Sequence, residues 1–289
     1  MSGPLLRRAG DHPRSRRFRR GIYLLPSLFT TLNMALGYYA LYHAVQGSVA
    51  EPWHYDNAAK AIGFAVIFDG LDGRIARMTN TESDFGREFD SLADVITFGV
   101  APAFLAWMWG FRTLAPLNGS DMMARIVQLG AIATFLFLIA GASRLARFNI
   151  QVNPQPSNPG RPGKKYFVGM PIPAGAGVIA AIVHFTDGAP VMTWWMGLIW
   201  AALVFATGYL MISTWRFYSF KDLDFRSRHP FWVVLIVGGV IACVRYFSEY
   251  FLFFLALFYM LSGVFARLLY IIRRRGSPPA PPLEATPAR

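Results

Sequence analysis

The chain has 289 residues, of which 54% are hydrophobic and 15% are charged, and its mean hydropathy is +0.36. A water-soluble globular domain carries more charge and fewer long apolar runs, so this composition excludes that class and predicts a polytopic membrane protein. The net charge of +12 does not indicate a nucleic-acid-binding protein, because the basic residues do not form a patch on a soluble domain. Cys243 is the single cysteine, so the chain cannot form an internal disulfide.

The apolar runs predict an all-α membrane bundle, because each is close to the roughly 20 residues that cross a bilayer. They fall at 24–46, 58–77, 90–110, 126–148, 171–187, 191–214, 231–248 and 250–272. We therefore expect about eight transmembrane helices in one domain at 23–273. A basic tail at 1–22 precedes this domain, and a disordered Pro-rich tail at 274–289 follows it.

The distribution of Lys and Arg predicts how these helices are oriented. Threading them from a cytoplasmic N-terminus leaves only Lys60, Arg112, Arg125 and Arg245 near the outer side. The inner side receives Arg74, Arg77, Arg87, Arg144, Arg147, Arg161, Lys164, Lys165, Arg216, Lys221, Arg226, Arg228 and Arg273 to Arg275. Because cytoplasmic loops are enriched in positive charge, both termini are expected in the cytoplasm. We expect an integral protein of a bacterial inner membrane.

The first apolar run contains three polar residues, Thr30, Thr31 and Asn33. Threonines inside a helix usually bond to their own backbone, and we expect that here. Asn33 is different, because an amide inside a membrane normally needs a partner. Asn33 is therefore a candidate ligand-binding residue.

Four acids occur where the second run ends and the third begins: Asp69, Asp72, Asp90 and Asp94. The first two are three residues apart and the last two are four apart, so each pair projects from one face of its helix. The polar residues between the pairs can reverse the chain and bring the four carboxylates together. Their mutual repulsion would be severe without divalent cations, and all-oxygen ligation favours Mg²⁺, Mn²⁺ or Ca²⁺ over Zn²⁺. The sequence thus predicts a divalent-cation site that faces the cytoplasm.

The residues around these acids suit a phosphorylated ligand. Gly73 and Gly86 have no side chain, so a bulky ligand can approach the backbone, and Arg77 can hold a phosphate. In the alternative interpretation the acids lie in a solvated loop and pair with Arg74, Arg77 and Arg87. Acids at membrane helix ends are costly and usually functional, which favours the site.

Two arginines, Arg144 and Arg147, lie at the cytoplasmic end of the fourth run, on nearly one helix face. Either they anchor the helix as positive-inside residues, or they bind a lipid phosphate or a carboxylate. The Pro- and Gly-rich segment 150–165 that follows is predicted to be a cytoplasmic loop.

The aspartate segment carries a recognisable motif. At fixed spacing it contains Asp69, Asp72, Gly73, Ala76, Arg77, Gly86, Asp90 and Asp94. This pattern resembles the signature of the CDP-alcohol phosphatidyltransferases, membrane enzymes that move a phosphatidyl group from a CDP-linked lipid to an alcohol. The segments FDSLADVITFGVAPA, RLARFN and YFVGMPIPAGAG are similar to the branch of that family whose acceptor is serine. The likeness covers roughly residues 21–177.

The resemblance implies a reaction: the phosphatidyl group of CDP-diacylglycerol passes to the hydroxyl of L-serine, giving phosphatidylserine and CMP. The sequence offers no Ser or Cys paired with a His, so we expect direct displacement without a covalent intermediate. Alternatives are the same transfer to choline, inositol phosphate or glycerol phosphate, and cation transport. A transporter should carry midplane acids and internal repeats, which we do not find in the sequence.

The resemblance also assigns roles to residues. Two cations, Mg²⁺ or Mn²⁺ with Ca²⁺ as an alternative, are expected on Asp69, Asp72, Asp90 and Asp94, and Asp94 is also the expected general base. Arg144 or Arg147 is expected to recognise the serine carboxylate. We expect a homodimer among membrane lipids, with no nucleic-acid partner. The expected CDP-lipid-binding residues are Asn33, Asp69, Asp72, Gly73, Ala76, Arg77 and Gly86.

Overall fold

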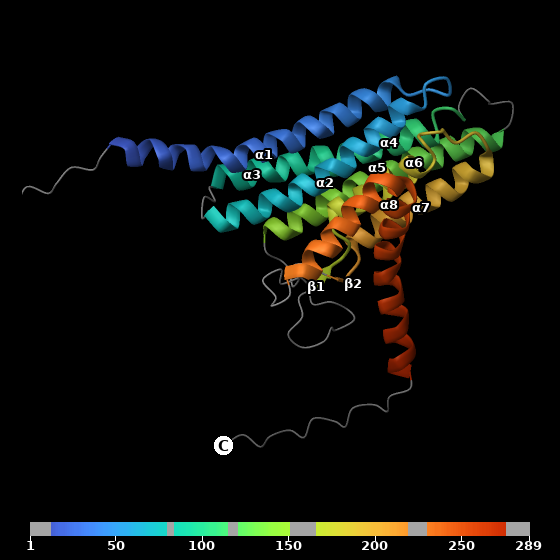
Figure 1. The fold of residues 1–289 in the computed structure, drawn as a ribbon. Coiled ribbons are helices and arrows are strands. Elements are labelled where there is room, and N and C mark those ends of the chain that lie inside the picture. The colour runs from blue at the N-terminus through green and yellow to red at the C-terminus, as the bar shows by residue number, and fades with distance from the viewer. Residues whose placement is uncertain (1–12, 80–83, 115–120, 151–165, 219–229, 276–289) are drawn as a thin grey trace, which may run out of the picture.

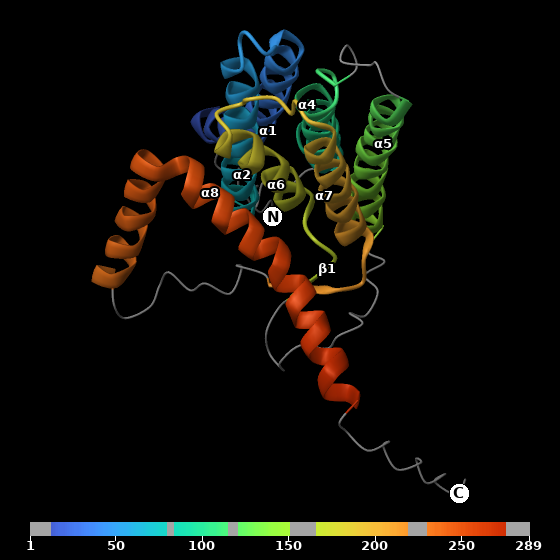
Figure 2. The same ribbon diagram turned by 90° about the vertical axis from the view of Figure 1, so that its right-hand side faces the viewer.

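The computed structural model describes residues 13–79, 84–114, 121–150, 166–218 and 230–275. Most of them are helical, and Figures 1 and 2 show the helices before α8 gathered side by side in a bundle. The elements are α1 (Pro13–Gln46), α2 (Trp53–Thr79), α3 (Asp84–Asp94), the π-helix η1 (Val95–Val100), α4 (Ala101–Gly110), α5 (Asp121–Asn149), β1 (Tyr166–Val168), α6 (Ile172–Phe185), α7 (Trp194–Ile212), β2 (Arg216–Tyr218) and α8 (Pro230–Arg275).

Each predicted apolar run contains a helix, so the mostly helical class is confirmed. Among the described residues, four segments are long and apolar enough to cross a membrane: Phe85–Gly110, Asp121–Asn149, Trp194–Ile212 and Val237–Ile272. The N-terminal boundary differs from the prediction, since α1 begins at Pro13 and not near residue 24. Almost all of the predicted loop and most of the C-terminal tail lie outside the described residues.

Small side chains fill the contact between α1 and α2. Ala40 and Ala44 of α1 and Ala58, Ala61 and Ala65 of α2 are all buried. Membrane helices pack closely where such residues meet, because no large side chain separates the backbones. This contact fixes α2, and therefore Asp69, relative to α1.

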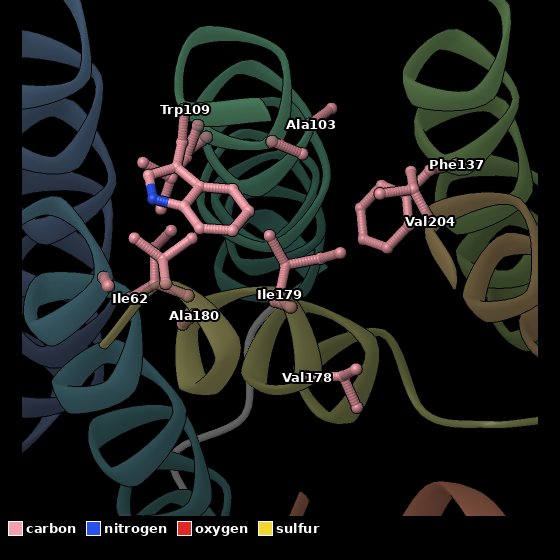
Figure 3. Packing of buried hydrophobic residues seen from close by; sticks show 14 of the residues in the cluster. Ile62, Ala103, Trp109, Phe137, Val178, Ile179, Ala180 and Val204 are labelled. Carbon is pink, nitrogen blue, oxygen red and sulfur yellow. The ribbon is translucent and has the colours of Figure 1, made fainter. Parts of the chain in front are cut away.

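α6 packs inside the bundle. Figure 3 shows Ile179 and Ala180 of α6 lying toward Trp109 of α4 and Ile62 of α2. All four side chains are at least 95% buried. The outside of the bundle is also apolar, as at Phe135, which is 60% exposed. An extended exposed apolar surface of this kind is typical of a protein that contacts lipid.

The two short strands, which are separated in the chain by α6 and α7, form an antiparallel two-stranded sheet that the sequence did not predict, with Phe167 opposite Phe217. Gly169 follows β1 with a φ of 75°, in the left-handed region, and a Cβ there would lie 2.5 Å from the carbonyl oxygen of Met211. Glycine is therefore required at this close approach.

α8 is bent at Phe247, whose φ of −139° and ψ of 36° are not helical. The bend coincides with the predicted break between the last two apolar runs. It divides α8 into a first half, 230–246, and a second half, 248–275. Figure 2 shows the first half standing away from the bundle, while the second half crosses beside it.

Candidate active site

The second half of α2 and the end of α3 bring three of the four predicted acids together. One carboxylate oxygen from each of Asp69, Asp90 and Asp94 lies within 4.8 Å of the other two, and all three residues are half-buried. We call these three residues the aspartate cluster. Asp72 is three residues beyond Asp69 on α2, but its side chain lies outside the described part of the structure. The side chains of Ala76 and Arg77 and the surroundings of Gly73 lie outside it as well.

The aspartate cluster fits a divalent cation. Ligand oxygens on opposite sides of one ion are roughly 4 to 5 Å apart for Mg²⁺ to Ca²⁺ bond lengths. The three oxygens, within 4.8 Å of one another, can therefore share an ion. Hard carboxylate oxygens are the ligands that Mg²⁺, Mn²⁺ and Ca²⁺ prefer. Gly86 lies on the same helix as Asp90, one turn before it.

A π-helical turn directly follows Asp94. In η1 the amide N–H of Ala101 donates to the carbonyl of Ile96, five residues back. Pro102 explains this local change, because proline has no N–H and its ring clashes with the carbonyl four residues earlier in a regular helix. Such turns are frequent at functional sites.

α1 contributes polar groups to the site. Thr30 donates a long hydrogen bond of 3.5 Å to Oδ1 of Asp90, so its hydroxyl contacts another helix, which the sequence did not predict. Asn33 is 2% exposed, and its Oδ1 has no hydrogen-bond partner among the described residues. Thr97 of η1 donates to the backbone carbonyl of Asn33 at 3.1 Å. Thr30 could have been identified as a candidate site residue from the sequence, because it is one helical turn before Asn33.

The two arginines of α5 differ in their surroundings. Arg147 donates from Nη2 to the carbonyl of Ile212 at 3.3 Å, so it joins α5 to the end of α7. The Nε atom of Arg144 is buried without a hydrogen-bond partner among the described residues, and this guanidinium is within electrostatic range of Tyr259 on α8. Arg144 is thus the better placed of the two to receive an anion.

The end of α5 lies beside the acid-bearing helix. Asn149 donates from Nδ2 to Oγ of Ser91 on α3 at 2.9 Å. Neither residue was identified from the sequence, because a single Asn and a single Ser carry no pattern. This contact places the arginine-bearing end of α5 on the same side of the bundle as the aspartate cluster.

One serine is paired with a histidine, a contact that the sequence did not reveal. Nε2 of His184 lies 2.9 Å from Oγ of Ser248, and Nδ1 of the same ring lies 2.5 Å from Oδ1 of Asp56. Asp56 is in the first turn of α2, thirteen residues before Asp69. At about 1.5 Å per residue, the two acids are about 20 Å apart along the helix. The serine–histidine pair is therefore not part of the aspartate cluster.

Comparison with known proteins gives one family. The family model for CDP-alcohol phosphatidyltransferase matches residues 23–208. A Helicobacter pylori protein named CDP-diacylglycerol--serine O-phosphatidyltransferase is 35% identical over 214 residues, which are 72% of this chain and 77% of the relative. A Methanocaldococcus jannaschii protein of the same name is 32% identical over 72% of this chain and 83% of its own length. One from Saccharomyces cerevisiae is 36% identical over 54% of this chain and 51% of its own length.

Proposed function

We propose that the chain, which belongs to the CDP-alcohol phosphatidyltransferase family, transfers the phosphatidyl group of CDP-diacylglycerol to L-serine and releases CMP. The aspartate cluster carries this proposal, because it gathers the acids of the motif within the matched region. The assignment of serine as the acceptor rests on relatives whose names specify serine. The bacterial and archaeal relatives align with about 70% of this chain.

The cations belong to the same proposal. The family is generally dependent on divalent cations, and the chain has an acidic group able to hold one. We infer that Asp69, Asp72, Asp90 and Asp94 hold two ions, Mg²⁺ or Mn²⁺. Held by these residues, the ions would neutralise the diphosphate of the CDP-lipid and favour departure of CMP.

The reaction follows as a direct displacement. The serine hydroxyl oxygen forms a bond to the phosphatidyl phosphorus, and the bond between that phosphorus and the CMP oxygen breaks. Asp94 is the proposed base that accepts the hydroxyl proton, because it stands at the end of α3, half-buried and beside the other two acids. The Ser248–His184 pair is about 20 Å away along α2, so it does not provide a covalent route.

Substrate binding is assigned to the surrounding residues. Arg144 is proposed to bind the serine carboxylate, since its buried Nε has no partner among the described groups. Arg147 is proposed to support this end of α5 through Ile212. The residues proposed for the CDP-lipid are Asn33, Asp69, Asp72, Gly73, Ala76, Arg77 and Gly86.

The four apolar segments and the family fit an integral membrane protein. Beyond this we propose eight crossings, with both termini and the aspartate cluster on the cytoplasmic side of a bacterial inner membrane. The excess of Lys and Arg in the loops at that end supports this orientation. We also propose a homodimer, in which the protruding first half of α8 offers an apolar surface to a second copy.

One assay tests the proposed function. Purified protein in detergent receives CDP-diacylglycerol, a divalent cation and, in separate reactions, serine, glycerol phosphate, inositol phosphate or choline. We expect CMP and phosphatidylserine with serine alone. If product forms only with another alcohol, the chain catalyses the reaction of the family, but its acceptor is that alcohol and not serine. No CMP with any alcohol, from protein that still binds the CDP-lipid, would overturn the proposal.

A further inference from the structure

A second polar site lies at the opposite end of the bundle from the aspartate cluster. It consists of Asp56 at the start of α2, His184 at the end of α6 and Ser248 at the bend of α8, and we call these residues the serine triad. The three helix segments are far apart in the sequence. Their side chains nevertheless form one continuous chain of hydrogen bonds, 2.5 Å from Asp56 to His184 and 2.9 Å from His184 to Ser248.

Each ring nitrogen of His184 has the partner that it has in a serine–histidine–aspartate catalytic triad. Nδ1 faces the carboxylate, and Nε2 faces the hydroxyl. A carboxylate that accepts a hydrogen bond from Nδ1–H holds the ring in the tautomer whose Nε2 can accept the proton of the serine. Asp56 and His184 are buried, whereas Ser248 is half-buried and closer to the surface.

Lys60 keeps the carboxylate charged. Its Nζ lies 2.5 Å from Oδ2 of Asp56, the oxygen that does not face His184. Burial would raise the pKa of Asp56, but hydrogen bonds from His184 and Lys60 outweigh it and lower that pKa below its ordinary value. An ionised carboxylate is the form that orients a histidine as a base.

The bend at Phe247 distinguishes Ser248 from serines that only satisfy their own helix. Ser262, further along α8, donates to the carbonyl of Tyr259 within the helix, the common behaviour of a helical serine. Ser248 instead reaches His184 on another helix. It also begins the second half of α8.

Ser248 is not among the residues that line the apolar groove of α8, but residues next to it in the sequence are. Its neighbours Phe247, Tyr250 and Phe251 line a groove of about 570 Å³ on α8, and Phe254 extends the wall along the helix. A groove lined by aromatic and aliphatic side chains suits a hydrocarbon chain.

We propose that Asp56, His184 and Ser248 form a serine-hydrolase site that cleaves an acyl ester whose hydrocarbon chain lies in the groove of α8. Oγ of Ser248 forms a bond to the ester carbonyl carbon, and the hydroxyl proton moves to Nε2 of His184. The carbon–oxygen bond to the alcohol breaks, and His184 returns the proton to the leaving oxygen. Water then attacks the acyl–Ser248 ester in the same way, so the products are a fatty acid and an alcohol.

An alkyl fluorophosphonate tests this site directly, because Oγ of an activated serine displaces its fluoride and keeps the phosphonyl group. Purified wild-type protein in detergent is treated with the probe, and the adduct is measured by intact mass and located by peptide mapping. We expect one adduct, on Ser248. Ser248→Ala should lose it, and the matched control Ser262→Ala should keep it. Asp56→Asn should slow labelling by about a hundredfold or more, as loss of base activation does.

A second measurement separates catalysis from packing. Thermal melting of Ser248→Ala shows whether the fold survives without the hydroxyl, and hydrolysis of a p-nitrophenyl acyl ester shows turnover. Wild-type protein that gives no adduct above a heat-denatured sample would overturn the proposal, even if Ser248→Ala melts earlier, because the triad would then be a structural contact only. An adduct that persists in Ser248→Ala would overturn it as well.

Discussion

Oγ1 of Thr30 lies 3.5 Å from Oδ1 of Asp90, although the two residues are 60 positions apart in the chain. Helix α1 therefore helps to orient one acid of the aspartate cluster. Thr30→Val keeps the shape of the side chain and removes the hydroxyl. A hydrogen bond to a charged group contributes about 1.5 to 3 kcal/mol, and this one is long, so we expect a loss of about three- to tenfold in phosphatidyl transfer.

Thr134→Val is the matched control, because Thr134 donates at 2.9 Å to the carbonyl of Gly130 inside its own helix. Its transferase rate should stay within about twofold of wild type, as expected for a hydroxyl that serves only its own backbone. Equal rates in the two variants, whether both normal or both reduced, would mean that the contact of Thr30 with Asp90 has no specific role.

The Asp56–His184 contact predicts acid sensitivity. The hydrogen bonds from His184 and Lys60 hold the pKa of Asp56 below its ordinary value of 3.8, against the effect of burial. The folded state thus favours the ionised carboxylate. This stabilising contribution is complete above the ordinary pKa and is lost as pH falls through the lower folded pKa.

Thermal melting between pH 7 and pH 3 measures this effect. Asp56→Asn should melt earlier than wild type at pH 7, and its melting temperature should fall less as the pH is lowered. Asp121→Asn, which removes an exposed acid at the start of α5, should follow wild type throughout. If Asp56→Asn and wild type differ by the same amount at every pH, Asp56 does not contribute through its charge.

Removing divalent cations should abolish phosphatidyl transfer, because the aspartate cluster brings three carboxylates within 4.8 Å. Activity should return when Mg²⁺ or Mn²⁺ is added to chelated protein. The transferase activity should not depend on thiols, so Cys243→Ser should behave as wild type in oxidising and reducing buffer. Undiminished turnover after exhaustive chelation would remove the cations from the proposed function.

Local patterns predicted the parts of the structure that depend on one helix at a time. Apolar runs located the helices because a bilayer requires about 20 apolar residues to cross it. The spacing of four placed Asp90 and Asp94 on one helix face, and both belong to the aspartate cluster. The start of α1 was misplaced because hydropathy marks the apolar part of a helix only, and arginine, which is common in residues 13–20, is a good helix former.

Contacts between helices could not be predicted in this way. The bonds of Ser248 and Asp56 to His184 depend on how three helices meet, and no spacing in the sequence encodes that. The difference between Arg144 and Arg147 has the same origin. It follows from the positions of α7 and α8, which the pattern of α5 does not contain.

Arg144 and Arg147 should give different phenotypes. Arg144→Ala removes the guanidinium whose buried Nε has no partner among the described residues, so the serine concentration for half-maximal rate should rise by about tenfold or more. Arg147→Ala loses a hydrogen bond to Ile212 and should mainly lower thermal stability. Titrating serine at fixed CDP-lipid, with a melting curve for each variant, separates these effects. If the serine concentration for half-maximal rate is unchanged in Arg144→Ala, the arginine does not bind serine. Both arginines would then serve only as positive-inside anchors of α5.

Asp94 and Asp69 are both in the aspartate cluster, but their proposed roles differ. Asp94→Asn keeps the size of the side chain and one oxygen ligand, while it removes the charge and the basicity. Loss of a general base lowers rates by about 100- to 10,000-fold, so transfer should nearly cease while CDP-diacylglycerol still binds through the remaining acids. Asp69→Asn should lose affinity for the CDP-lipid as well, because its proposed role is to hold the cations.

Measuring CDP-lipid binding and single-turnover transfer in both variants distinguishes a base from a ligand. The pH dependence adds a second criterion, since loss of a base should remove the acidic limb of the rate profile, whereas a weakened cation site should recover at high cation concentration. If Asp94→Asn keeps more than about a tenth of the wild-type rate, a smaller loss than removal of a base causes, Asp94 is not the base. The serine hydroxyl must then be activated by a bound cation or by another group.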